Sequence, residues 1–381
     1  MSVEELRILH TSDVHLGAPF RFLGARGEEQ RLALRAALER TVALARDRGC
    51  RAILVAGDLF DSAFDARESD VAFAAGCLSG AGPSCRVAIL PGSHDCHAPG
   101  SVLDRERARF EAGGSVVVLT PDRPVAVFSD LSLAVHGAVS TSPSPAPGAL
   151  AALAPLPECR YNVCLAHGSV AGAGPPLDAR EEPLRLEELA AGFDYVALGH
   201  WHSHRCVRVE GPPAHYSGSP EIVARDQRGA GSVVSVTLSP AGALVERVPV
   251  GRRRIRRVSI DCTGLGSTEE LVKKIAAAAK PEPDLIVELE LAGYVGMDAA
   301  IDADAAAAAL AGSYFSVRLA GDGPSREILR DELLAVPQDT VAGRFARIML
   351  REIDAAEGAE RSIREEALQI GMQILRGRNP V

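Results

Sequence analysis

The amino-acid sequence predicts an α/β protein with a layered first domain, a small α+β domain and C-terminal helices. Two observations carry this prediction: short apolar runs alternate with amphipathic stretches over the first 250 residues, and the composition shifts at Gly251. The runs are rich in Val, Ile, Leu and Ala and do not alternate strictly with polar residues, as is typical of buried strands. They lie at 6–10, 52–56, 87–90, 116–119, 163–166 and 195–198. Strands that alternate with helices favour a layered α/β fold.

The remaining elements of the first domain follow from spacing. The segment 28–48 carries apolar residues at helical intervals and is followed by Gly49, so it predicts an amphipathic helix with a glycine C-cap. After Gly211 the apolar runs 214–217, 233–238 and 244–250 have the pattern of antiparallel strands, with a turn at Gly242.

Beyond Gly251 the sequence predicts two smaller parts, which gives three domains in all: 1–250, 251–325 and 326–381. The middle part has alternating strand and helix patterns, at 255–261, 267–280, 284–291, 299–310 and 314–319. The last part is mostly helical and has two apolar faces. Because helices this short are marginal alone, we expect them to dock on the body of the protein or on a partner.

Length and composition limit the possible functions. The chain has 381 residues, which suits two or three domains of roughly 150 residues each. An apolar fraction of 47% and a charged fraction of 24% exclude a disordered or collagen-like chain. The net charge of −9 excludes a uniformly basic surface, but bound cations can still govern a nucleic-acid cleft. Aromatic residues, at 4%, are too few to favour a module that stacks single-stranded bases.

The sequence predicts a cytoplasmic protein that does not enter a membrane. Its first ten residues, MSVEELRILH, carry two glutamates where a signal peptide would be basic, and no run of 18 apolar residues occurs. Eight cysteines are present without a Cys-x-x-Cys pair, so we expect reduced thiols that fill core positions.

Polar residues of ligand type follow five of the predicted strands. They are Asp13 and His15, Asp58, Ser93 with His94 and Asp95, His167, and His200 with His202. Ligands of open α/β sheets bind outside the carboxyl ends of the strands. A single Asp there is usually a turn former, and a single His is usually hydrogen-bonded. Their grouping at one edge, flanked by glycines, is instead typical of a metal site.

These residue types suit a two-metal hydrolytic centre. Its ions lie about 3.5–4 Å apart and repel each other, so an anionic oxygen has to lie between them, and Asp58 is the natural candidate. Mixed imidazole and carboxylate ligands favour Mn, Fe or Zn over calcium. Two cations polarise a phosphoryl group and activate water at neutral pH. His94 is expected to act as an acid or electrostatic stabiliser, oriented by Asp95.

The motif series Asp-x-His, Gly-Asp, Gly-x-His-Asp, His-Gly and Gly-His-x-His, in this order, resembles the calcineurin-like metallophosphoesterase superfamily. The stretch ILHTSDVHLG at 8–17, with VAGDLFDS, YSGSP and an α+β cap, is similar to the nuclease subunits (SbcD-type exonucleases) of bacterial SbcCD-type DNA repair complexes. The resemblance covers residues 6–320 well and the C-terminal helices more loosely. It implies a four-layer α/β/β/α sandwich with a small α+β cap.

The resemblance also implies two divalent metal ions, with manganese favoured and Fe, Zn or Mg as alternatives. The first would be held by Asp13, His15, Asp58 and His202, and the second by Asp58, residue 93, His167 and His200. His94 would act near the leaving oxygen. The family has Asn where this chain has Ser93. Because a hydroxyl is a shorter and weaker neutral donor than an amide oxygen, we expect a weaker second site.

The function implied is metal-dependent DNA exonuclease or phosphodiesterase activity in DNA repair, with 3′-to-5′ polarity and an endonuclease capacity. The implied partners are DNA, a second copy of the chain, and an SMC-like coiled-coil ATPase of SbcC type bound near 341–374. Two alternatives stay open. One is a metallophosphodiesterase for a small substrate such as a cyclic nucleotide or a phosphoprotein. The other is a non-catalytic scaffold for the ATPase, which only Ser93 supports.

Two further features have two interpretations each. The segment GRRRIRRV places Arg252, Arg253 and Arg254 in one cluster, which is either a solvated strand or a phosphate contact for a DNA duplex. Trp201 lies between two candidate ligands and is expected to pack its loop, with contact to a nucleotide as the alternative.

Overall fold

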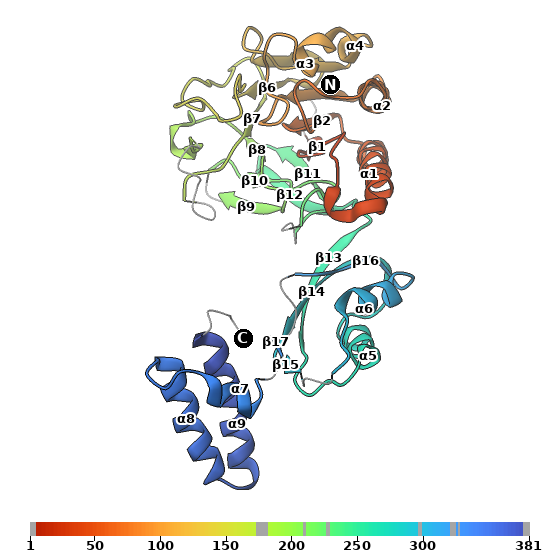
Figure 1. The fold of residues 1–381 in the computed structure, drawn as a ribbon. Helices are drawn as coiled ribbons and strands as arrows, with labels where there is room; N and C mark the ends of the chain where they lie inside the picture. The colour runs from red at the N-terminus through yellow and green to blue at the C-terminus, as the bar shows by residue number, and fades with distance from the viewer. Residues whose placement is uncertain are drawn as a thin grey trace. The chain divides into compact units, whose positions relative to one another are not determined.

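A computed structural model of the chain describes residues 5–172, 182–208, 211–225, 229–295, 299–320, 325–326 and 328–375 (Figure 1). The chain divides into two compact units, Met1–Arg254 and Ile255–Val381. The boundary falls inside the arginine-rich segment at which the composition shifts.

The first unit contains a six-stranded sheet that ends in the candidate ligand loops. Its strand order is β12-β11-β1-β2-β3-β4. The strands from β1 to β4 are parallel, and β11 pairs antiparallel with both β1 and β12. Their bounds are Leu6–Thr11 for β1, Ala52–Ala56 for β2, Arg86–Leu90 for β3, Val116–Val118 for β4, Ser232–Ser239 for β11 and Gly242–Pro249 for β12.

A second six-stranded sheet has the order β5-β6-β7-β8-β10-β9. Its four inner strands are parallel, and the edge strands β5 and β9 are antiparallel to their neighbours. The bounds are Val125–Phe128 for β5, Leu133–Gly137 for β6, Tyr161–His167 for β7, Tyr195–Gly199 for β8, Arg205–Arg208 for β9 and Ala214–Tyr216 for β10.

The two sheets pack face to face on a shared apolar core. Ile8 of β1 and Leu54 of β2 lie in one buried cluster with Val163 of β7 and Tyr195 of β8. The opposite face of the first sheet is covered by helices, whose Leu38 and Val71 join Ile53 in another cluster. The helical segments of this unit are α1 (Gly27–Asp47), α2 (Glu68–Ser79), α3 (Val102–Arg105), α4 (Arg107–Glu111) and the 3-10 turns η1 (Arg21–Arg26), η2 (Ser129–Leu131) and η3 (Leu186–Glu188).

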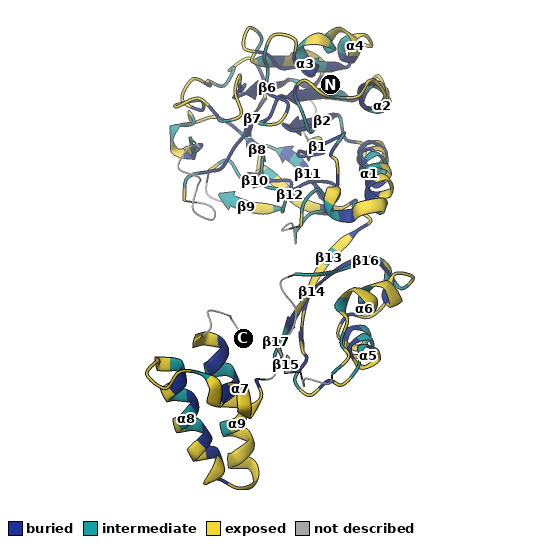
Figure 2. Ribbon diagram, viewed as in Figure 1, coloured by how far each residue is buried: buried dark blue, intermediate teal, exposed yellow. Residues whose placement is uncertain are grey.

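The outer face of the second sheet is also covered. Leu150, Leu153 and Leu186 pack there against Ala166 and Leu198. In the described part of the chain this layer consists of loops and the 3-10 turn η3 instead of an α-helix. Figure 2 shows the inner strands of both sheets buried, the edge strands β9 and β12 largely not buried, and the outer surfaces of the helices exposed. Two large sheets with outer covering layers confirm the predicted α/β sandwich.

The second unit has two separate apolar cores. In one, α5 (Thr268–Ala278) and α6 (Ala303–Leu310) pack on a sheet of order β13-β14-β16. In the other, three helices pack on one another. The remaining bounds are Arg254–Asp261 for β13, Glu282–Ala292 for β14, Tyr294–Val295 for β15, Tyr314–Leu319 for β16, Ser325–Arg326 for β17, Arg330–Ala335 for α7, Val341–Asp354 for α8 and Gly358–Leu375 for α9. The division into domains 251–325 and 326–381 stays a prediction.

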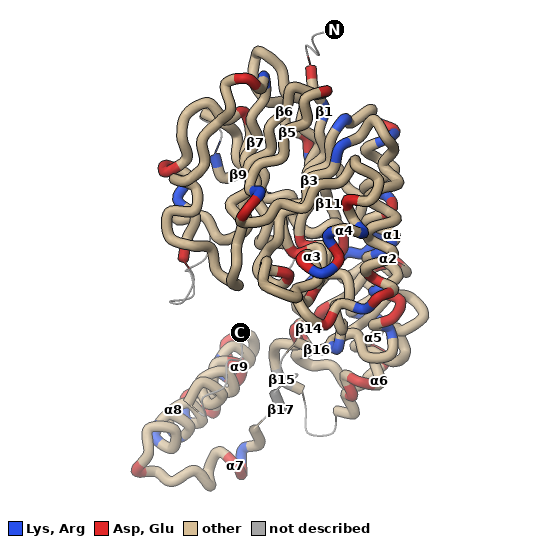
Figure 3. The backbone as a smooth tube through the Cα atoms, turned by 90° about the horizontal axis from the view of Figure 1, so that it is seen from above, with Lys and Arg blue, Asp and Glu red and all other residues tan. Residues whose placement is uncertain are grey.

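Two whole-chain properties bear on function. Among the described residues, no helix combines the length and the apolar character that a membrane crossing requires. Basic and acidic residues are interspersed along the backbone, for example around α1 and α2 (Figure 3). Several of these arginines are paired with carboxylates, such as Arg26 with Glu29 and Arg35 with Asp70.

Candidate metal centre

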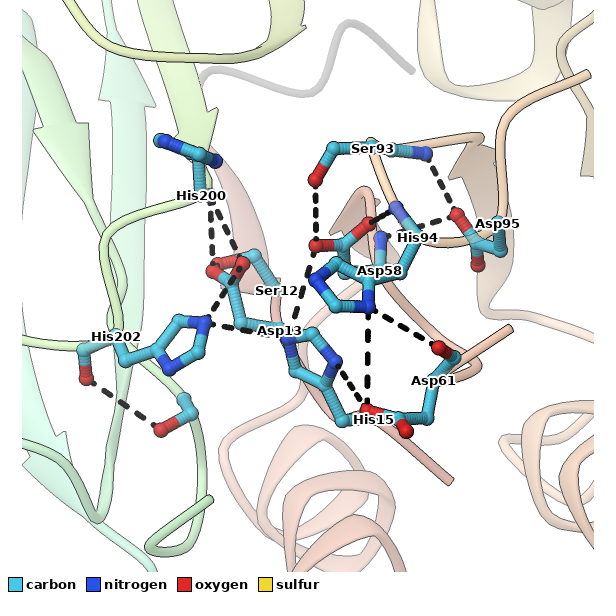
Figure 4. A network of polar contacts seen from close by, with 12 residues as sticks. Ser12, Asp13, His15, Asp58, Asp61, Ser93, His94, Asp95, His200 and His202 are labelled. Carbon is cyan, nitrogen blue, oxygen red and sulfur yellow. Dashed lines mark hydrogen bonds and ion pairs between the residues drawn. The ribbon is translucent and has the colours of Figure 1, made fainter. Parts of the chain in front are cut away.

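The candidate ligands meet at the carboxyl ends of parallel strands from both sheets (Figure 4). Asp13 and His15 follow β1, Asp58 follows β2, and His167 is the last residue of β7. The first two loops are joined beyond the strands, since the amides of Asp13 and His15 donate to the carbonyls of Gly57 and Asp58, each at 3.0 Å. The other candidates, Ser93, His200 and His202, follow β3 and β8.

The backbone is strained at these loops. Six described residues other than glycine have positive φ, and four of them are candidate ligands: Asp13 at 54°, His15 at 52°, Asp58 at 53° and His200 at 105°. Such conformations cost about 1–3 kcal/mol each and persist only where the surroundings hold them. Their concentration at one edge therefore supports a functional site on grounds independent of residue type.

Asp95 is one of the groups that hold the strained loop. Its fully buried carboxylate accepts hydrogen bonds from the amides of Gly92 at 2.6 Å, Phe60 at 3.1 Å and Asp58 at 3.2 Å. Burial, followed by the charge of Asp58, raises the pKa of Asp95 to about 6. Asp95 thus fixes the backbone of the loop that carries Asp58. The expectation that it orients His94 is wrong, because its carboxylate is engaged by these amides.

Asp61 performs the orienting role instead. Its backbone carbonyl accepts a hydrogen bond from Nδ1 of His94 at 3.1 Å, and its carboxylate Oδ1 lies 4.0 Å from the same nitrogen. The same Oδ1 accepts from Nδ1 of His15 at 3.2 Å. Asp61 was not predicted as a site residue, although it lies in the motif Gly-Asp-Leu-Phe-Asp, three positions after Asp58.

One group of donors comprises Asp13, His15 and His202, whose ligand atoms all lie within 4.8 Å of one another. Nε2 of His15 lies 3.2 Å from Nε2 of His202, which in turn lies 3.9 Å from Asp13 Oδ1. Because Nδ1 of His15 donates to Asp61, its Nε2 carries the lone pair in the neutral ring. Two imidazole nitrogens and a carboxylate oxygen therefore converge on one point.

Asp13, Asp58 and His167 form a second group within the same distance limit. Asp58 Oδ2 lies 3.2 Å from His167 Nε2 and 3.6 Å from His15 Nε2, so this oxygen is placed between the two groups. Nδ1 of His167 donates to the carbonyl of Ala56 at 2.9 Å, which leaves its Nε2 as the acceptor in the neutral ring.

Ser93 and His200 lie next to the two donor groups described above. The Ser93 hydroxyl donates to Asp58 Oδ2 at 3.1 Å and lies 3.2 Å from His167 Nε2. The ring of His200 lies 5.4 Å from that of His167, centroid to centroid, and the His200 amide donates to the Asp13 carboxylate at 2.9 Å. Among the described residues, His200 belongs to none of the compact groups of His, Cys, Asp and Glu donors, whereas His94 forms a third such group with His15 and Asp58.

The donor chemistry fits two divalent cations. Asp13 and Asp58 are almost fully buried carboxylates facing imidazole nitrogens. Burial lowers the pKa of His167, but the Asp58 charge outweighs it and brings the value to about 10. The buried carboxylates therefore favour positive charge at this point of the site, which a bound cation would also supply. Carboxylate and imidazole ligands suit Mn, Fe or Zn.

The glycines around the centre are required by close packing. An added Cβ on Gly199 would lie well inside contact distance of the Ala56 carbonyl and 2.8 Å from Nδ1 of His167. An added Cβ on Gly92 would overlap the Asp58 carboxylate. These glycines allow the loops to approach the ligands closely.

The three arginines of the cluster differ in burial. Arg253 is only 6% exposed, so its burial does not support a contact with DNA, and the DNA contact of this cluster stays a prediction. Arg252 and Arg254 are exposed. The amides of Arg252 and Arg253 donate to the buried Glu221 carboxylate, at 2.8 and 3.2 Å, so this segment closes the first unit.

Sequence reasoning also missed two hydroxyls that support Asp13. Ser12 Oγ donates to Asp13 Oδ2, and it lies 2.8 Å from Ser217 Oγ. Both serines are fully buried. Ser217 belongs to the stretch YSGSP, and Glu221 follows that stretch directly. This motif could therefore have indicated both residues as parts of the site.

The chain is similar to several known proteins. The family model of the calcineurin-like phosphoesterases matches residues 6–204. The DNA double-strand break repair protein Mre11 of Methanosarcina mazei is 26% identical over 302 residues, which are 76% of this chain and 45% of that protein. The chain thus spans less than half the length of this relative. The crystal structure of TT1561 from Thermus thermophilus is 17% identical with a TM-score of 0.41, covering 64% of this chain and 99% of that one.

Proposed function

Because the chain belongs to the calcineurin-like phosphoesterase family, we propose that it is a manganese-dependent DNA exonuclease of 3′-to-5′ polarity with an endonuclease capacity, acting in cytoplasmic DNA repair. Members of this family use a dinuclear divalent metal centre. The observation that carries the proposal is the position of Asp58 Oδ2 between His15 Nε2 and His167 Nε2, where one carboxylate can serve both donor groups.

In this proposal, Asp13, His15, Asp58 and His202 hold one ion, and Asp58, His167, Ser93 and His200 hold the other. The bound ions would supply Lewis acidity toward the phosphoryl oxygens and lower the pKa of water. The residues themselves contribute rigid placement, because Asp61 and the Ala56 carbonyl fix the rings of His15 and His167.

His94 is proposed as the general acid that donates a proton to the leaving oxygen. Its side chain is half-exposed, and its ring lies 4.7 Å from the ring of His15. Nδ1 is engaged by the Asp61 carbonyl, so the proton is transferred from Nε2. The Asp61 carboxylate also lies 4.0 Å from Nδ1, so both polar groups of Asp61 are close to the ring nitrogen that faces away from the substrate in this role.

The choice of DNA as substrate is supported by the likeness to Mre11, a DNA double-strand break repair protein. The alternative is a phosphodiesterase for small substrates, which would need the same metal centre. The test is a nuclease assay with labelled duplex and single-stranded DNA, in Mn²⁺, Mg²⁺ or chelator, beside hydrolysis of bis-p-nitrophenyl phosphate.

We expect cleavage of DNA in Mn²⁺, none with chelator, and a loss of about 10²–10⁴-fold in His94→Ala. His97→Ala is the matched control, because His97 lies nearby in sequence and outside the three donor groups. Hydrolysis of bis-p-nitrophenyl phosphate without DNA cleavage would favour the small-substrate alternative, and no hydrolysis of either would favour the non-catalytic scaffold.

We also propose that the C-terminal helices bind an SMC-like coiled-coil ATPase and that the chain dimerises. The support for the ATPase site is apolar surface on α8 and α9, where Val341 is 74% exposed, Ile363 is 66% exposed and Ile348 is also exposed. Such side chains on short helices favour a covered surface. Ile348→Glu with Ile363→Glu should abolish co-purification with the ATPase and leave bis-p-nitrophenyl phosphate hydrolysis intact. Retained co-purification would contradict this placement, and sedimentation tests the dimer separately.

A further inference from the structure

We infer that Arg205 forms a phosphate-binding subsite beside the metal centre, which holds a second phosphate of a polynucleotide next to the one that is cleaved. The inference rests on the proposed function and adds to it a residue that would recognise the polymer. It is carried by a column of three stacked side chains: Tyr216, Trp201 and Arg205.

The base of the column is rigid. Tyr216 is fully buried, its hydroxyl donates to the Gly168 carbonyl at 2.8 Å, and it accepts from the Val170 amide at 2.8 Å. The Trp201 ring stacks on the Tyr216 ring, with 5.6 Å between centroids and 29° between planes. The guanidinium carbon of Arg205 lies 5.4 Å from the centroid of the Trp201 ring, in a cation–π contact.

Each layer of the column is tied to a loop of the metal centre. Gly168, which Tyr216 contacts, directly follows the candidate ligand His167. Trp201 lies between the candidate ligands His200 and His202, and its Nε1 donates to Ser169 Oγ at 3.2 Å. The position of Arg205 is therefore coupled to the loops that place the ligands, which is what a substrate-positioning group requires.

The interactions of Arg205 leave its hydrogen-bond donors unused. Arg205 is exposed, and over the described ranges of the chain the one interaction of its guanidinium is with the Trp201 ring. By contrast, the partly exposed Arg26 and Arg48 are paired with Glu29 and Glu246. A guanidinium that lies on a ring keeps its in-plane N–H groups available, and their fork geometry matches two oxygens of a phosphate.

A single phosphodiester would be met by the metal centre itself. The Arg205 guanidinium beside that centre can bind the substrate in addition only if the substrate carries a second phosphate. A nucleic-acid strand presents a phosphate about every 3.4 Å of helix axis, so a neighbouring phosphate is always present. This predicts that Arg205 matters for DNA and not for bis-p-nitrophenyl phosphate, which has one phosphodiester.

The test compares Arg205→Gln with wild type on both substrates in Mn²⁺, and measures duplex DNA binding over a range of salt concentrations in a His94→Ala background. We expect about tenfold weaker DNA binding, a log–log salt slope smaller by about one, and unchanged hydrolysis of bis-p-nitrophenyl phosphate. Arg205→Lys should keep the salt slope and lose part of the affinity, because the charge remains without the fork.

Arg48→Gln is the matched control, since Arg48 is paired with Glu246 and precedes β2, at the amino ends of the strands. It should bind DNA as wild type does. If wild type cleaves DNA and Arg205→Gln has the same affinity and salt slope, the subsite is refuted and the proposed function stands. If wild type hydrolyses bis-p-nitrophenyl phosphate but neither binds nor cleaves DNA, the proposed function fails and the subsite with it.

Discussion

Side chains at the centre are held by partners that are not their neighbours in the sequence. His94 is followed directly by Asp95, yet Asp95 turns inward to three backbone amides, and Asp61 from another loop contacts His94. The donors themselves could be predicted because each follows an apolar strand. Their partners could not, since the partner of a loop side chain depends on how two loops pack.

Ser93 offers the sharpest test at the scale of one residue. Its hydroxyl lies near both Asp58 Oδ2 and His167 Nε2, so Ser93 is placed to assist the second donor group as a neutral, short ligand. We predict that Ser93→Asn strengthens binding of the second Mn²⁺ about tenfold, because an amide oxygen is a better donor to a hard cation than a hydroxyl. Isothermal titration with Mn²⁺ measures the two affinities.

The control for this experiment is Ser129→Asn, which adds the same amide at an exposed position in η2, away from the donor groups. It should leave both Mn²⁺ affinities unchanged. Equal second-site affinity in wild type and Ser93→Asn would show that Ser93 does not limit metal binding.

Elements with strong apolar runs could be predicted closely. The prediction of a strand at 52–56 is confirmed by β2, and the helix predicted over 28–48 is α1. α2 was not predicted, because its many small residues, such as Ala74 and Ala75, give a weak helical pattern. The edge strand β5 was not predicted either.

The end of β8 supports a prediction about packing. Gly199→Ala should lower the free energy of unfolding by about 1–3 kcal/mol and weaken metal binding, because the new methyl group would collide with the Ala56 carbonyl and displace His167. Urea unfolding followed by the fluorescence of Trp201, the single tryptophan, reports on this unit.

Gly76→Ala is the matched control on α2, where an added Cβ meets nothing within 4 Å. It should raise the free energy of unfolding by about 0.5–1 kcal/mol, because Ala has the higher helix propensity. A Gly199→Ala protein as stable as wild type would contradict the close approach at β8.

Across the whole molecule, the net charge of −9 overstates how acidic the surface is. Asp13, Asp58, Asp95 and Glu221 all belong to the acidic count, and all are buried. Two of them face the candidate metal centre, and the other two accept backbone amides. Composition alone could not reveal this, because it does not distinguish interior carboxylates from solvated ones.

Buried histidines give the molecule a predictable response to acid. His10 of β1 is fully buried between the sheets, with Nδ1 3.0 Å from the Tyr195 hydroxyl of β8. Burial, followed by the charge of His215, lowers the pKa of His10 from 6.5 to about 3. Between these values the unfolded chain binds the proton and the folded chain does not. The stability contributed by neutral His10 is therefore present above pH 6.5 and is lost as the pH falls toward 3.

The measurement is the difference in free energy of unfolding between wild type and His10→Asn, from urea titrations at pH 7.5, 6 and 5 with chelator present. The variant should be less stable at pH 7.5, where it lacks the fit of the imidazole between the sheets. The gap should narrow by about 1.4 kcal/mol for each pH unit below 6.5, because only wild type has to exclude a proton at this position. Contributions from the candidate ligands are common to both proteins and cancel in the difference. A gap that stays constant from pH 7.5 to pH 5 would mean that His10 is protonated in the folded protein.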